Sequence, residues 1–108
     1  MVAFGDTTTL TGKSGAQYEF SIFQRFTRFK PNAGIYVMGR GQGAGEYAFC
    51  FVGHTRDLSV RPLNAAKTEC FGAFGVDHIF ILEEPNETRR AQIVDDLIQA
   101  FTPRCNTI

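Results

Sequence analysis

The fold is decided by two apolar segments, Ile35-Tyr36-Val37-Met38 and Tyr47-Ala48-Phe49-Cys50-Phe51-Val52. Both are rich in β-branched and aromatic residues, so each predicts a β-strand. The segment between them holds four glycines and predicts an extended hairpin loop. Neither of the common glycine patterns that cradle phosphate fits this loop. The two segments therefore predict a hairpin at the centre of the chain.

Further elements follow on both sides of this hairpin. Residues 7–10 and 18–23 predict two strands joined by a turn at Gly12-Lys13-Ser14-Gly15. Thr55 can cap a short helix over about residues 57–61, although Pro62 would remove a backbone donor inside it. Residues 78–82 predict another strand. Asn86 caps a final helix over about residues 87–101, and Pro103 stops it.

The final helix has a stripe of apolar residues at helical spacing, which predicts the face that packs on the core. Its members are Ala91, Val94, Leu97, Ile98 and Phe101. The order of elements predicts an α+β fold, with a central antiparallel sheet flanked by helices. We expect one domain over residues 1–108, with residues 1–33 as an N-terminal hairpin extension and residues 34–106 as the core.

Composition limits the classes of function. Eleven Lys and Arg balance eleven Asp and Glu, so no global field draws the chain to nucleic acid or to anionic lipid. A nucleic-acid role needs a local patch, for which the candidates are Arg25, Arg28, Arg56 and Arg61. No apolar run has the length of a membrane span. We expect a cytoplasmic protein without a membrane partner.

The three cysteines, Cys50, Cys70 and Cys105, are odd in number and lack metal-binding spacing. Reduced thiols are the expectation that fits a cytosolic protein, and a disulfide or a metal role is the alternative.

Several short motifs follow one another along the chain. They are Gly34-Ile35-Tyr36, Phe51-Val52-Gly53 with Arg61, Leu97-Ile98, and Pro103 with Asn106. This ordered set resembles the GIY-YIG nuclease domain over residues 34–106. The resemblance implies a small domain built from strand, strand, helix, strand and helix.

The resemblance also implies a chemistry. Phosphodiester hydrolysis needs a nucleophilic water, a proton acceptor and positive charge on the developing oxyanion. In the family a Tyr lies near the water and an Arg faces the phosphate, which match Tyr36 and Arg61. The family's second Tyr corresponds to Phe51, which cannot transfer a proton. The family's metal-holding Glu corresponds to Val94, which cannot bind Mg²⁺.

The remaining family-matched positions are expected around a cleft. These cleft residues are Phe51, Gly53, His54, Val94 and Asn106. Asn106 is expected to brace the turn after the final helix. Asp95 and Asp96 stand beside Val94 but turn about 100° per residue away from it, so we expect them to be solvated rather than metal ligands.

Three functions stay open at this point. The first is a catalytically defective GIY-YIG-like domain that binds nucleic acid or a protein and holds no cofactor. The second is an active nuclease that uses Mg²⁺ through an atypical ligand. The third is a scaffold protein with no nucleic-acid role.

Overall fold

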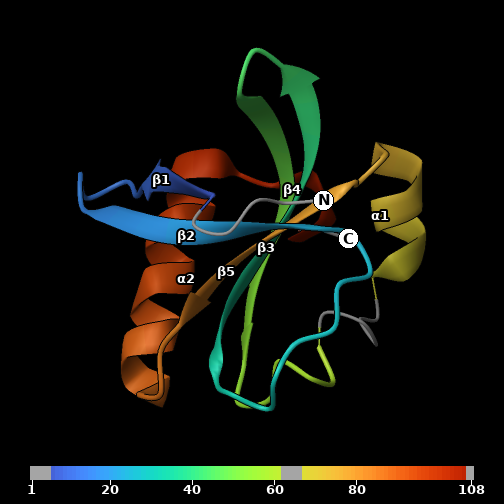
Figure 1. The fold of residues 1–108 in the computed structure, drawn as a ribbon. Coiled ribbons are helices and arrows are strands. Elements are labelled where there is room, and N and C mark those ends of the chain that lie inside the picture. The colour runs from blue at the N-terminus through green and yellow to red at the C-terminus, as the bar shows by residue number, and fades with distance from the viewer. Residues whose placement is uncertain (1–5, 62–66, 107–108) are drawn as a thin grey trace.

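The computed structural model describes residues 6–61 and 67–106, and shows one antiparallel sheet with helices on its two faces (Figure 1). The elements in chain order are β1 (Thr7–Thr11), β2 (Gln17–Gln24), β3 (Gly34–Gly43), β4 (Glu46–Thr55), α1 (Thr68–Phe74), β5 (His78–Glu83), α2 (Glu87–Phe101) and the 3₁₀ turn η1 (Arg104–Asn106). This confirms the predicted α+β class.

The sheet has five strands in the order β1-β2-β5-β3-β4. The N-terminal hairpin does not stand apart, because β2 pairs antiparallel with β5 from Ser21 opposite Ile81 to Gln24 opposite His78. β3 lies between β5 and β4, so both of its edges are hydrogen-bonded. The strand predicted at Ile35-Tyr36-Val37-Met38 therefore lies in the interior of the sheet.

The β3–β4 hairpin is longer than predicted. The expected extended loop is instead a continuation of both strands, which pair up to Gly43 opposite Glu46 and project beyond the rest of the sheet (Figure 1). The reversal itself is tight, since Ala44 and Gly45 both have positive φ, at 54° and 75°. A turn with positive φ at two successive residues has a backbone twist that matches the right-handed twist of the strands it joins.

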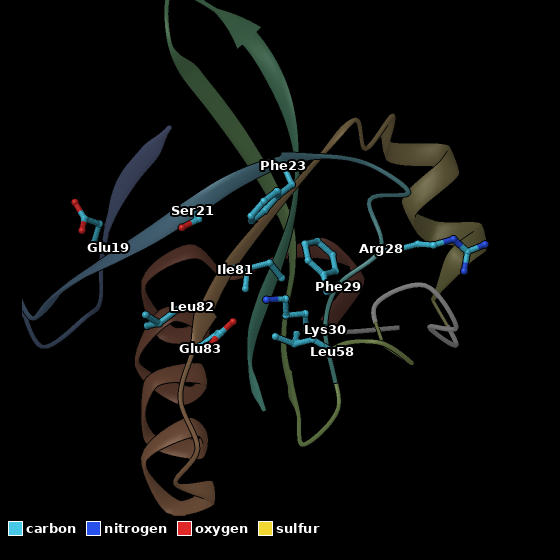
Figure 2. A pocket seen from close by; sticks show the side chains of 10 residues that line it. All are labelled: Glu19, Ser21, Phe23, Arg28, Phe29, Lys30, Leu58, Ile81, Leu82 and Glu83. Atoms are coloured by element: carbon cyan, nitrogen blue, oxygen red, sulfur yellow. The ribbon is translucent and has the colours of Figure 1, made fainter. Parts of the chain in front are cut away.

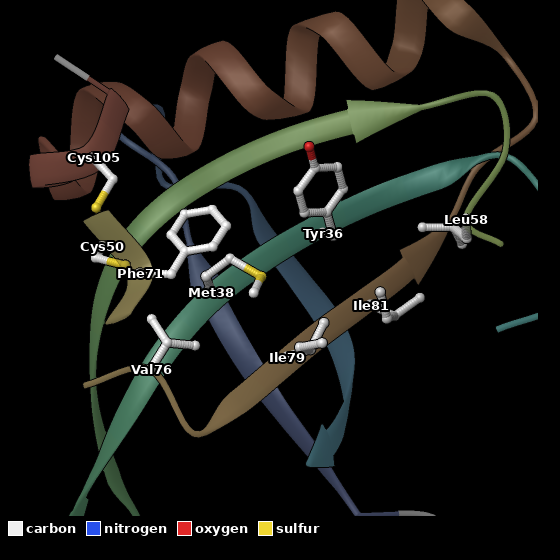
Figure 3. Packing of buried hydrophobic residues seen from close by; sticks show 9 residues of the cluster. All are labelled: Tyr36, Met38, Cys50, Leu58, Phe71, Val76, Ile79, Ile81 and Cys105. Atoms are coloured by element: carbon white, nitrogen blue, oxygen red, sulfur yellow. The ribbon is translucent and has the colours of Figure 1, made fainter. Parts of the chain in front are cut away.

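Two clusters of buried side chains lie on opposite faces of the sheet, because neighbouring strand residues point to opposite sides. The face with α2 carries Ile35, Val37, Val52, Phe80, Ile93 and Leu97, with Leu10, Tyr18 and Phe20 from the N-terminal hairpin. We call it the α2 face. The other face, the α1 face, carries Tyr36, Met38, Cys50, Leu58, Phe71, Val76, Ile79, Ile81 and Cys105 (Figure 3).

The prediction of a helix over residues 57–61 is wrong. These residues form a turn in which Asp57 accepts hydrogen bonds from the backbone N and the hydroxyl of Ser59. An aspartate that binds its own backbone two residues on favours a turn over a helix. Pro62 lies outside the described residues. The helix α1 begins further on, at Thr68.

Helix α2 has the predicted bounds, and Asn86 caps it by accepting from Arg89 N at 2.8 Å. Its buried stripe differs from the prediction, because Ala91 is exposed and Arg90, Ile93 and Leu97 are the buried residues. Among the described residues, no helix is long and apolar enough to cross a membrane.

The expectation of three free thiols is also wrong. Cys70 and Cys105 form a disulfide across a sequence separation of 35 residues, and Cys50 is a free, buried cysteine. The pair forms because α1 and η1 pack against the same face of the sheet, which brings the two Cα atoms to 5.9 Å. Spacing along the chain does not reveal this contact.

Candidate functional site

Tyr36 is at the centre of the family-matched residues. It lies on the α1 face of β3, is 4% exposed, and stacks on Phe51 with the ring centroids 5.8 Å apart (Figure 3). Burial raises the pKa of the Tyr36 hydroxyl, and the positive charge of Arg61 opposes that rise. The fold therefore brings Tyr36 and Arg61 close enough to interact electrostatically, although 25 residues separate them.

Gly53 leaves room for this arrangement. It pairs with Tyr36 across the β3–β4 ladder. A Cβ on Gly53 would lie 2.7 Å from Phe51 Cε2 and 3.0 Å from Tyr36 Cζ. Gly34 is constrained in a similar way, since a Cβ there would lie 2.7 Å from the carbonyl oxygen of Leu82. Packing alone therefore explains why glycine occupies positions 34 and 53, whatever chemistry the site performs.

Asn106 braces the same region from outside the sheet. Its Nδ2 donates to Val52 O and its Oδ1 accepts from Val52 N, both at 2.9 Å. Val52 belongs to β4, which is an edge strand, so these backbone groups face away from β3. Asn106 thus braces the middle residue of the Phe51-Val52-Gly53 motif, whereas the prediction had it brace the turn after the final helix and the cleft.

His54 does not share a face with Tyr36. It stands opposite Ile35 on the α2 face, where its Nδ1 accepts from Arg90 Nε at 3.3 Å. Arg90 is 4% exposed and its Nη1 also donates to the carbonyl oxygens of Glu84 and Pro85, each at 3.0 Å. The expectation of His54 in a cleft beside Tyr36 is therefore not met.

Arg90 is the residue that sequence reasoning missed. A charged residue that is nearly fully buried needs hydrogen-bond partners, and Arg90 finds them in two carbonyls and an imidazole. The signal was present in the spacing, since Arg90, Ile93 and Leu97 recur three and four residues apart on one side of the helix.

Val94 also lies away from Tyr36. It is half-buried and packs with the cluster on the α2 face. A carboxylate at this position would be on the far side of the sheet from the Tyr36 hydroxyl. The placement of a former metal ligand beside Tyr36 is therefore not supported.

The two neighbouring aspartates are engaged elsewhere. Asp95 accepts from Gln99 Nε2 at 2.7 Å. Asp96 was expected to be solvated, but it ties α2 to the N-terminal hairpin by accepting from Ser14 Oγ and Tyr18 Oη, both at 2.7 Å. Within residues 6–61 and 67–106, no three His, Cys, Asp or Glu side chains gather to hold a metal ion.

The four candidate phosphate contacts do not all converge. Arg25 is held at the start of β5, where its Nη1 donates to Val76 O at 3.3 Å and its guanidinium lies over the Phe26 ring. Arg56 and Arg61 are exposed and follow β4, at the opposite end of β5. Arg28 belongs to the segment between β2 and β3, which meets the turn after β4 where Leu58 N donates to Asn32 O at 2.9 Å.

A pocket of about 530 Å³ opens on the α1 face beside this segment (Figure 2). Phe23 and Phe29 meet edge to face in it, with their ring centroids 5.1 Å apart. Its polar lining is mixed in charge and consists of Glu19, Ser21, Arg28, Lys30 and Glu83. Tyr36 does not line this pocket, so it is separate from the Tyr36–Arg61 pair.

Comparison with protein-family models, with curated proteins and with solved structures finds no match for this chain. The relation to the GIY-YIG domain therefore rests on the motifs and stays a prediction.

Proposed function

We propose that this chain is a GIY-YIG-like domain that binds nucleic acid without hydrolysing it. The observation that carries the proposal is the Tyr36–Phe51 stack, with the positive charge of the exposed Arg61 near enough to act on the Tyr36 hydroxyl. An exposed arginine suits contact with a backbone phosphate. The proposal includes the expectation that the protein is cytoplasmic.

The local chemistry supports binding better than hydrolysis. Burial raises the pKa of Tyr36, so its hydroxyl stays protonated and is a weak base near neutral pH. Phe51 offers no second hydroxyl. Val94, which stands where the family has its metal-holding Glu, offers no oxygen ligand.

Binding is expected to be weak and electrostatic, because the chain has no net charge and its arginines are spread out. Fluorescence anisotropy with labelled single-stranded and duplex DNA and RNA, repeated at several salt concentrations, tests this. Arg61→Ala should lower the affinity and reduce the salt slope by about one. Arg89→Ala is the matched control, because Arg89 is an exposed arginine on α2, across the sheet.

Two outcomes would replace the proposal. Cleavage of plasmid or branched DNA with Mg²⁺ or Mn²⁺, abolished by Arg61→Ala, would establish the active nuclease. No binding at low salt, or equal losses in Arg61→Ala and Arg89→Ala, would remove the nucleic-acid role and leave the scaffold or protein-binding alternative.

A further inference from the structure

Helix α1 is a short cover on the face that carries Tyr36. It has seven residues, and Phe71 is its one buried side chain among those described. The Phe71 ring packs on Phe51 with the centroids 5.4 Å apart, and Phe51 stacks on Tyr36. A helix of this length is marginal on its own, so its position depends on its tertiary attachments.

The strongest of these attachments is the Cys70–Cys105 disulfide. Cys70 is adjacent to Phe71 in α1, and Cys105 is adjacent to Asn106 in η1. Asn106 in turn holds the backbone of Val52 between Phe51 and Gly53. One covalent bond thus links the cover to the segment that braces the strand beneath it.

The two sulfurs differ in access. Cys105 is fully buried, whereas Cys70 is only partly buried. We place the attack of an external thiolate on Sγ of Cys70, the more exposed residue of the pair, which breaks the S–S bond and releases the Cys105 thiolate to take up a proton. The second thiol of a dithiol reagent then displaces the mixed disulfide. The protein gains two electrons and two protons, and the dithiol becomes a cyclic disulfide.

We propose that the Cys70–Cys105 disulfide is a reversible redox tie that holds α1 closed over the Tyr36–Phe51 stack. Oxidation keeps the cover in place and reduction by a dithiol releases it, while the sheet and α2 stay folded. The sheet and α2 retain their own core on the opposite face, which includes Phe20, Phe80 and Leu97. The tie would open in a reducing compartment and close in an oxidising one.

Cys50 provides a built-in reporter of this opening. It is fully buried in the same cluster as Phe71 and Cys105. In the oxidised protein it should react slowly with iodoacetamide. In Cys70→Ala/Cys105→Ala, where it is the one remaining thiol, its alkylation should be at least about tenfold faster, as expected for a local opening. Wild-type protein without reductant is the matched comparison, and it also has a single free thiol.

Hydrogen exchange separates local release from general loss of stability. Exchange of the oxidised protein should be compared with exchange after dithiothreitol and with that of the double alanine variant. Amides of β2, β5 and α2 should lose only the protection that follows from the fall in global stability, whereas amides of α1 should exchange by a local opening that is absent from the oxidised protein. If α1 exchanges only together with the sheet after reduction, the disulfide is a structural staple, and unchanged protection of α1 would show that the cover does not depend on it. Neither measurement uses nucleic acid, so the result is independent of the proposed function.

Discussion

Gly53→Ala tests the packing at the centre of the candidate site. The added Cβ would lie 2.7 Å from Phe51 Cε2, 3.0 Å from Tyr36 Cζ and 3.1 Å from Tyr36 Oη. Real Cβ atoms essentially never approach another atom as closely as the first of these. Both rings are constrained, because Tyr36 is 4% exposed and Phe51 lies between Tyr36 and Phe71.

These contacts bound the loss in the free energy of unfolding that Gly53→Ala should cause. Overpacking of a filled core costs about 1–3 kcal/mol. Replacing glycine by alanine recovers about 0.4–1 kcal/mol through the unfolded chain where the native backbone allows it. The free energy of unfolding of Gly53→Ala should therefore fall by about 0–2.6 kcal/mol, centred on about 1.3 kcal/mol.

Gly72→Ala is the matched control, for which we expect the free energy of unfolding to rise rather than fall. Gly72 is an exposed residue inside α1, and a Cβ there would meet no atom within 4 Å. Alanine favours a helix over glycine by about 0.5–1 kcal/mol. This variant should therefore be more stable than the wild type.

Urea unfolding followed by circular dichroism measures both variants, with the slope of each transition compared to confirm a common unfolded state. Repeating Gly53→Ala in a Phe51→Leu background tests the origin of the loss, because leucine removes the ring atom at 2.7 Å. The two changes should then be less than additive. If Gly53→Ala stabilises the protein, Tyr36 and Phe51 do not lie over β4 as described.

Three further predictions concern the surroundings of this site. Reducing Cys70–Cys105, which closes a loop of 35 residues, should lower the free energy of unfolding by about 4 kcal/mol in urea melts; coincident curves with and without dithiothreitol would contradict the disulfide. Tyr36 should ionise above its ordinary pKa of 10.0, so the stability that its burial supports is present below pH 10 and is lost as the pH rises through the raised value. Arg61→Ala should raise that pKa further in an ultraviolet titration corrected with Tyr36→Phe, and an unchanged curve would remove the proposed pairing. Asn106→Asp turns a donor into an acceptor that faces a carbonyl oxygen and should cost about 1–3 kcal/mol; that carbonyl raises the pKa of the new carboxyl in the folded protein, so the loss should shrink as the pH falls toward about 4, and pH-independent melts would argue against the brace.

The fold was largely predictable, because local signals coincide with the observed elements. Segments rich in β-branched and aromatic residues marked the five strands, and Asn86 and Pro103 marked the ends of α2. The helix predicted after β4 does not form, because the Asp57 carboxylate accepts from the backbone N of Ser59 and holds a turn.

The site was harder to predict, because its geometry depends on contacts between distant segments. A β-bulge between Met38 and Gly39 skips Cys50, so Cys50 and Phe51 both contribute to the α1 face although they are consecutive. Strict alternation cannot anticipate this. His54 is a different case, because pairing is regular from Met38 opposite Phe51 to Ile35 opposite His54, so simple alternation after Gly53 places His54 on the α2 face.

The Asn106 contact has a consequence for how this sheet ends. A side-chain amide presents one N–H donor and one C=O acceptor, which are the groups that a neighbouring peptide unit would offer, so Asn106 stands in for one residue of a sixth strand. Unpaired edges invite pairing with another chain. A second copy that adds to β4 must first displace this amide, and the Phe51-Val52-Gly53 motif is thereby shielded from the self-association to which its apolar sequence would otherwise expose it.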